Sequence, residues 1–227
     1  MKSLLSYIHE GLLDDMEDVL SNTVNDFESS IKKDVESYLK KHYKIDGDIQ
    51  YTFDYNTEKF IVDVKGDVSV KYKTYCLNDT NIFDFGIVNG NFTCCAGLLQ
   101  SLVGSPKVVT GVFDCSFCDI KSLEGAPKTV KEFRCSYCTK LENLVGAPDT
   151  VDEFCCACCS NLKSLKGCPK VKEIFNCYNC KKLKTLKYAP TGVEKEFECT
   201  SCGKSWDNEE VRKKFNVKGK VFASYLD

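Results

Sequence analysis

The sequence has little of what most enzymes and membrane proteins depend on. Its 227 residues include two His (His9 and His42), one Trp, two Met and five Pro. Catalysis through a histidine base is therefore not expected. No apolar run is long enough to cross a bilayer, so we expect no membrane partner. The formal net charge of −2 also excludes overall positive charge as a basis for binding nucleic acid.

Recurring catalytic patterns are missing as well. The sequence has no pair of carboxylates placed for acid–base chemistry, no Ser-His-Asp set, no Cys-His pair and no glycine-rich phosphate loop. We therefore expect a non-enzymatic protein.

Cysteine, in contrast, is abundant, with 16 residues. The amino-terminal segment lacks the apolar stretch of a secretory signal and soon turns acidic. Most of the cysteines are therefore expected to be reduced thiols or metal ligands rather than disulfides.

The periodicity of apolar residues divides the chain into four parts. Residues 1–44 have a near-3.6-residue period, which predicts helix, with an interruption at Asn22 and Thr23. Residues 45–84 alternate apolar and polar side chains about a turn and predict a β-hairpin that caps the third part. Residues 85–204 form a repeat, and residues 205–227 predict a short helix and a strand as a second cap.

The repeat has a period of 20 to 22 residues. Its first position is phenylalanine, at Phe92, Phe113, Phe133, Phe154, Phe175 and Phe197. A cysteine stands two residues later, at Cys94, Cys115, Cys135, Cys156, Cys177 and Cys199. Three residues further on stand Gly97, Cys118, Cys138, Cys159, Cys180 and Cys202. Two apolar positions and, in most units, Gly-x-Pro close the unit.

The alternation of Phe-x-Cys places both side chains on one face of a short strand. One unit cannot bury this face alone, so successive units must stack, about 4.8 Å apart, with identical residues in register. The sequence therefore predicts a solenoid with columns of phenylalanine and cysteine inside it.

The unit written as V-x-x-F-x-C-x-x-C-x-x-L-x-x-L resembles the leucine-rich repeat, L-x-x-L-x-L-x-x-N/C-x-L-x-x-L. Phe and Cys replace two leucines, and an extra residue often precedes the next Leu. The F-x-C and S-L-E-G-A-P-K segments also resemble repeat proteins of gut bacteriophages. The resemblance implies an α+β fold: a leucine-rich-repeat-like solenoid of short stacked parallel strands with an N-terminal helix and β-hairpin cap.

Zinc is the alternative interpretation of the cysteines, because successive C-x-x-C pairs have the spacing of a zinc ribbon. The ligands would come from Cys115, Cys118, Cys135, Cys138, Cys156, Cys159, Cys177, Cys180, Cys199 and Cys202. Gly97 replaces the second cysteine in the first unit, and Cys is a small side chain that cores bury readily. We therefore expect a column of structural thiols and no cofactor.

Side chains between the inward positions form the candidate binding face for a protein partner. These residues are Asp114, Phe117, Arg134, Tyr137, Asn176 and Tyr178. Exposed aromatics beside charged groups are typical of interface hot spots. Cys95, Cys155 and Cys158 also fall on outward positions, while Cys76 and Cys168 have no predicted place. The lysines between 163 and 187 indicate a solvated face rather than a nucleic-acid site, and we expect a monomer.

The first ten residues resemble the capsid-targeting peptide of internal head proteins of T-even-like phages, M-K-x-x-x-x-[FY]-I-x-E. Met1, Lys2, Tyr7, Ile8 and Glu10 match this pattern. The resemblance implies cleavage after Glu10, packaging in the virion and action on a host protein in the host cytoplasm. A frayed helix start and a purely structural virion component are the alternatives.

Overall fold

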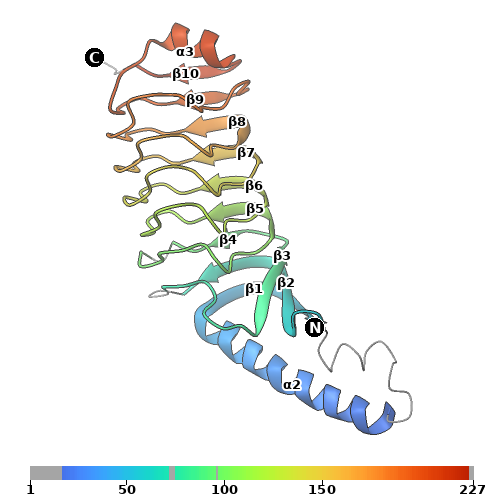
Figure 1. Ribbon diagram of the computed structural model, residues 1–227. Helices are drawn as coiled ribbons and strands as arrows, with labels where there is room; N and C mark the ends of the chain where they lie inside the picture. The colour runs from blue at the N-terminus through green and yellow to red at the C-terminus, as the bar shows by residue number, and fades with distance from the viewer. Residues whose placement is uncertain (1–16, 72–74, 96, 225–227) are drawn as a thin grey trace.

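A computed structural model describes residues 17–71, 75–95 and 97–224. The molecule is a β-solenoid of stacked parallel strands with a helix at its N-terminal end (Figure 1). The strands of the described residues form a single ten-stranded sheet in the order β1-β2-β3-β5-β6-β7-β8-β9-β10, with β4 beside β2 and β5.

Helix α2 (Glu17–His42) is continuous, so the interruption expected at Asn22 and Thr23 is wrong. Each of these residues lowers helix propensity by less than about 1 kcal/mol, which is too little to break a helix of this length. The helix packs on the hairpin through Val35 and Leu39, which are buried. Within the described ranges, no helix has the length and apolar character needed to cross a membrane.

The predicted hairpin consists of β1 (Tyr43–Asp54) and β2 (Lys59–Val70), paired antiparallel along their whole length. The pairing continues without a break past Gly47 and Gly66, which lie opposite each other, so residues 67–70 are the end of β2 and not a separate short strand. A Cβ on Gly47 would lie 2.1 Å from the backbone oxygen of Lys65. The length of β2 lets it pair with both β3 and β4.

The later strands all pair parallel: β3 and β4 each pair with β2, β5 pairs with both of them, and from β6 on each strand pairs with the one before it. The strands are β3 (Phe83–Val88), β4 (Phe92–Thr93), β5 (Val108–Asp114), β6 (Thr129–Arg134), β7 (Thr150–Cys155), β8 (Lys170–Asn176), β9 (Glu196–Glu198) and β10 (Lys220–Phe222).

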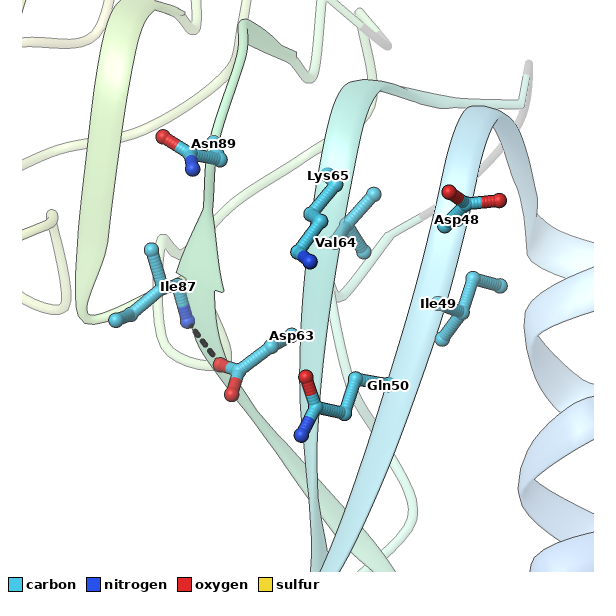
Figure 2. A pocket seen from close by; sticks show the side chains of 8 residues that line it. All are labelled: Asp48, Ile49, Gln50, Asp63, Val64, Lys65, Ile87 and Asn89. Carbon is cyan, nitrogen blue, oxygen red and sulfur yellow. Dashed lines mark hydrogen bonds between the residues drawn. The ribbon is translucent and has the colours of Figure 1, made fainter.

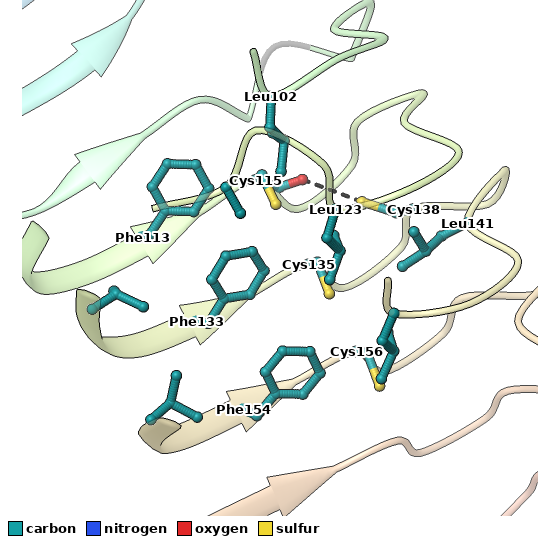
Figure 3. Close-up of a cluster of buried hydrophobic side chains, with 14 of the residues drawn as sticks. Leu102, Phe113, Cys115, Leu123, Phe133, Cys135, Cys138, Leu141, Phe154 and Cys156 are labelled. Carbon is teal, nitrogen blue, oxygen red and sulfur yellow. Dashed lines mark hydrogen bonds between the residues drawn. The ribbon is translucent and has the colours of Figure 1, made fainter. Parts of the chain in front are cut away.

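The core is a column of phenylalanine rings, as predicted. The six repeat phenylalanines have no exposed surface and pair in register from strand to strand. Their ring centroids are 5.0–6.4 Å apart. Figure 3 shows three of these rings beside the column of inward cysteines.

Helix α3 (Asn208–Phe215) covers the far end of this column (Figure 1). Asp207 caps it by accepting a hydrogen bond from the backbone N–H of Glu210 at 2.9 Å. Phe215 stacks on Phe197 with ring centroids 5.6 Å apart. The helix therefore closes a core that would otherwise end at open surface.

Replacing a central ring tests this core. Phe133→Ala should lower the free energy of unfolding by about 3–5 kcal/mol, because the two neighbouring rings cannot both close the gap. Urea unfolding measures the loss, and Lys131→Ala, an exposed change on the same strand, is the control. A loss for Phe133→Ala no greater than that of the control would contradict the inward assignment.

Candidate functional site

The second cysteine of each unit makes the same hydrogen bond in five successive coils. Its Sγ donates to the backbone oxygen of the first cysteine in the preceding coil, at 3.1–3.2 Å. The donor–acceptor pairs are Cys118 to Cys94, Cys138 to Cys115, Cys159 to Cys135, Cys180 to Cys156 and Cys202 to Cys177. Figure 3 shows the bond from Cys138. These thiols satisfy carbonyl groups that would otherwise be buried without a donor.

The ten cysteines that the zinc interpretation would use as ligands all lie in the core. All 16 cysteines fall within the described ranges, and none forms a disulfide. Among the described residues, no three His, Cys, Asp or Glu side chains are grouped as metal ligands. A zinc ligand must be a thiolate, whereas the second-column thiols use their protons as hydrogen-bond donors.

Burial lowers the acidity of thiols in the first column, the cysteines two residues after each repeat phenylalanine. It raises the pKa of Cys94, Cys115, Cys135 and Cys177 well above the usual range for cysteine. A thiol that stays protonated is a poor nucleophile and a poor metal ligand. These four thiols of the first column are therefore poorly suited to nucleophilic or metal chemistry.

The raised pKa values predict loss of stability in alkali. Thiols of the unfolded chain ionise above about pH 8.5, while these four buried thiols keep their protons in the folded protein. Each of the four therefore stabilises the fold fully below that pH, and above it removes about 1.4 kcal/mol per pH unit. Urea unfolding at several pH values from 8 upward measures the slope. Cys135→Ala should make it shallower, and an unchanged slope in that variant would contradict the assignment.

The remaining cysteines lie nearer the surface. Cys76 is exposed, and Cys95, Cys155, Cys158 and Cys168 are half-buried. Cys155 and Cys95 still have partners: the Cys155 thiol lies 3.1 Å from the Ser136 hydroxyl, and the Cys95 thiol donates to the backbone oxygen of Asp114 at 3.7 Å. Burial also raises the pKa of Cys95 to about 12. Cys168, which the sequence did not place, occupies the middle position of a Gly-x-Pro turn.

Alkylation distinguishes the two groups of thiols. Iodoacetamide should label Cys76 first and the four half-buried cysteines slowly, with peptide mass spectrometry as the readout. The 11 buried cysteines should react only after unfolding. Labelling of Cys135 or Cys138 at the rate of Cys76 in folded protein would show that the columns are open to solvent.

Two of the six predicted partner-binding residues also stabilise the turn that follows their own strand. The Oδ1 atoms of Asp114 and Asn176 accept the backbone N–H two residues later, both at 2.9 Å. Glu198 does the same for Thr200 at 2.7 Å. These are side-chain turns, so the polar residue types at this position have a local structural cause. Arg134 instead forms an ion pair with Glu132 at 3.1 Å.

The corner places one residue of each coil in the left-handed backbone region. The residues are Phe117, Tyr137, Cys158, Asn179 and Ser201, with φ between 57° and 62°. The backbone N–H groups of the first four continue the ladder between coils; that of Phe117, for example, donates to the backbone oxygen of Ser136 at 2.8 Å. The backbone of this column is therefore fixed while most of its side chains project from the core.

Two aromatic side chains of this column stack on the surface. The rings of Phe117 and Tyr137 have centroids 4.7 Å apart and planes 7° from parallel. They are 58% and 49% exposed. We call this pair the aromatic stack. A side-chain hydrogen bond with Cys158 raises the pKa of Tyr137 and links the stack to the next coil. Tyr178 is 42% exposed and belongs to the neighbouring column.

The lysines between 163 and 187 are exposed, and several pair with the preceding coil. Lys163 lies 3.2 Å from Glu142 and Lys172 lies 2.8 Å from Asp152. This pairing of neighbouring coils accounts for part of the lysine run without a nucleic-acid partner.

A pocket of about 390 Å³ lies between β1, β2 and β3 (Figure 2). Its most prominent polar group is Asp63, whose Oδ1 accepts the backbone N–H of Ile87 at 2.6 Å. Asp67 accepts the N–H of Asn91 at 2.8 Å in the same way. Asp63 lies where the pairing of β2 with β3 shifts register, and its carboxylate bridges the two strands there. The sequence reasoning missed these roles, although an acid within an apolar strand was a signal for them.

No protein-family model, curated protein or solved structure matches the chain. The function must therefore be inferred from the geometry of the molecule itself.

Proposed function

We propose that this protein is a non-enzymatic, protein-binding repeat module whose binding surface centres on the aromatic stack. Tyr178 and Arg134 extend that surface. The observation that carries the proposal is that two bulky aromatic residues occupy exposed corners with positive φ. A left-handed backbone is unfavourable for such residues, by roughly 1–2 kcal/mol each.

The fold itself does not require aromatic residues at these corners. Asn179 and Ser201 adopt the same backbone conformation at equivalent positions. The rings of Phe117 and Tyr137 do not fill the core either, because about half of each remains exposed. Strained backbone and exposed aromatic surface both tend to occur at recognition sites. Aromatic residues also supply much of the binding energy in protein interfaces.

We further propose that the solenoid is leucine-rich-repeat-like. The hydrogen-bonding cysteine occupies the position that the leucine-rich pattern gives to Asn or Cys. Both residue types carry a donor, and here the donor reaches the backbone of the preceding coil. The inward Phe and Cys columns then replace the two leucines.

The proposed setting is a phage infection, in which the protein is packaged in the virion and acts on a host protein in the host cytoplasm. The support is the likeness of the repeat and of residues 1–10 to phage proteins. That segment and the cleavage site after Glu10 lie outside the described residues. A structural component of the virion is the alternative function.

Peptide mapping of phage particles tests the packaging proposal. Cleavage after Glu10 predicts that the mature protein begins at Gly11 in purified virions. The protein expressed alone, without the phage protease, should keep residues 1–10 and serves as the control. Intact residues 1–10 in virions, or absence of the protein from them, would contradict the proposal.

Asparagine substitutions test the binding surface without disturbing the fold. Asn tolerates the left-handed conformation, so Phe117→Asn with Tyr137→Asn should leave the melting temperature unchanged or raise it. Binding should weaken at least about tenfold, the effect of losing a moderate hot spot of about 1.4 kcal/mol. The matched control is Asn179→Ser, which exchanges two residues that the chain already uses at this corner.

The measurement has two stages. Affinity capture from bacterial lysate identifies a protein that the wild type retains, and calorimetry with that purified protein then gives Kd for each variant. Equal Kd values for the wild type and the double variant would contradict the proposed surface. Failure of the wild type to retain any protein specifically would contradict protein binding.

A further inference from the structure

The fourth and fifth repeat coils, which begin at Phe154 and Phe175, carry many positive charges and almost no negative ones. Residues 155–190 contain eight lysines and one acid, Glu173. Glu173 lies on β8 and pairs with Lys195 at 2.7 Å. Lys163 pairs with Glu142 in the preceding coil, and Lys172 pairs with Asp152 in the strand before its own. The other lysines of this segment have no acid left within it.

Three of these lysines lie at the Gly-x-Pro turns, and we call them the lysine face: Lys166, Lys170 and Lys187. All three are exposed, and among the described residues none of them forms an ion pair. The Lys166 N–H donates to Oγ of Ser164 at 3.1 Å. The Lys187 N–H donates to Oγ1 of Thr185, also at 3.1 Å. Lys166 and Lys187 therefore occupy equivalent places in successive coils.

A groove of about 630 Å³ lies between the Gly-x-Pro turns of the third and fourth coils. Lys166 and Lys170 both line it, one on each side of Gly167. Asp149 is the acid among its lining residues. The groove therefore offers two cations against one carboxylate, with an excess of positive charge for a ligand to balance.

The fifth coil carries a tyrosine where the earlier turns have glycine. A side chain is costly at this position, because a Cβ on Gly167 would lie 2.5 Å from the backbone oxygen of Leu144. Tyr188 nonetheless has a φ of 71°, and its side chain is 51% exposed, so it does not fill the core. Nζ of Lys187 lies 4.9 Å from the centroid of this ring. Tyr188 therefore holds one ammonium group of the lysine face at the surface.

These features favour carboxylates over nucleic acid as the ligand. Single-stranded nucleic acid binds by stacking successive bases on several aromatic side chains. On the described Gly-x-Pro turns, Tyr188 is the one exposed aromatic, and Lys187 already lies over its ring. A row of ammonium groups without a row of rings matches an acidic polypeptide instead.

We infer that the lysine face binds an acidic segment of the protein partner. The inference rests on the proposed protein-binding function and gives the chemistry of a second contact surface. Lys187 and Lys166 contact carboxylates of this segment, and Lys170 extends the contact along the groove. Lysine ammonium groups are compact charges on flexible stems, so they adapt to glutamate or aspartate at variable positions. Complementary charge of this kind also speeds the encounter of two proteins.

A peptide probe tests the chemistry. A fluorescent peptide of alternating Glu and Gly is titrated with the full-length protein at low ionic strength, and anisotropy gives Kd. The peptide should bind saturably and more weakly as salt is added, because the contacts are exposed charges. The same peptide with Gln in place of Glu should not bind. No saturable binding of the Glu peptide, or tighter binding of an oligothymidylate with the same number of charges, would overturn the inference.

Charge-removing variants test the location. Lys166→Gln with Lys187→Gln should weaken binding of the Glu peptide about three- to tenfold. Lys107→Gln with Lys128→Gln is the matched control, because both residues are exposed lysines that follow the proline of earlier turns and their loss changes the net charge equally. Equal weakening in the two double variants would show that overall charge attracts the peptide, and would overturn the assigned site.

Tyr188→Gly tests whether the tyrosine serves binding. Glycine is the residue of the earlier turns, so the melting temperature should stay unchanged or rise. Binding of the Glu peptide should weaken about two- to fivefold, because Lys187 loses the ring that holds it. A variant that binds the peptide as the wild type does would remove Tyr188 from the site and overturn that part of the inference.

The partner protein separates this inference from the proposed function. Weaker partner binding by the Lys166→Gln and Lys187→Gln variant, with retention in the Lys107→Gln and Lys128→Gln control, is the expected result. A partner that binds the first variant as it binds the wild type, but not the Phe117→Asn and Tyr137→Asn variant, would overturn the acidic contact and leave the aromatic surface intact. A partner that is insensitive to all these changes would overturn both.

Discussion

The fixed spacing between parallel coils is the constraint on which the rest of this molecule depends. Strands of one sheet lie about 4.8 Å apart, so any side chain that points inward meets its counterparts at nearly that distance. Phenylalanine satisfies the constraint by stacking, with ring centroids 5.0–6.4 Å apart in the repeat column. Cysteine satisfies it because it is small, apolar enough to bury and able to donate one hydrogen bond.

The corner at the end of each strand converts this internal order into an external surface. Inside, the second cysteine bonds to the carbonyl of the preceding coil; outside, residues such as Asp114 cap the turn. The backbone between them is held in the left-handed region, and its side chains lie outside the core. This arrangement lets Phe117 and Tyr137 present a stack of rings.

Periodicity was sufficient to predict which residues lie in the core. The positions of Phe133 and Cys135 follow from strand alternation and from the need of each unit for a neighbour. The hairpin and the C-terminal helix were predictable from equally local signals. Periodicity could not supply the length of β2, which depends on the close approach at Gly47, or the continuity of α2 across Asn22.

The surface was less predictable for a related reason. Alternation tells whether a side chain points in or out, but carries no information on the sign of φ or on bonds from side chains to backbone. The capping roles of Asp114 and Asn176 and the exposure of Gly97 therefore appear only in the structure. Phe117 and Tyr137 were predicted to face outward together, yet their stacking depends on the corner geometry.

The state of the second-column thiols tests this account most directly, and Raman spectroscopy of the S–H stretch reports it. Five cysteines that donate to backbone carbonyls predict a strong S–H band at the low frequency of hydrogen-bonded thiols, with no S–S band. Cys138→Ala should weaken that band by one thiol, whereas Cys76→Ala should leave it unchanged. Loss of the S–H signal from the native protein would mean thiolates or disulfides in these positions and would contradict the account.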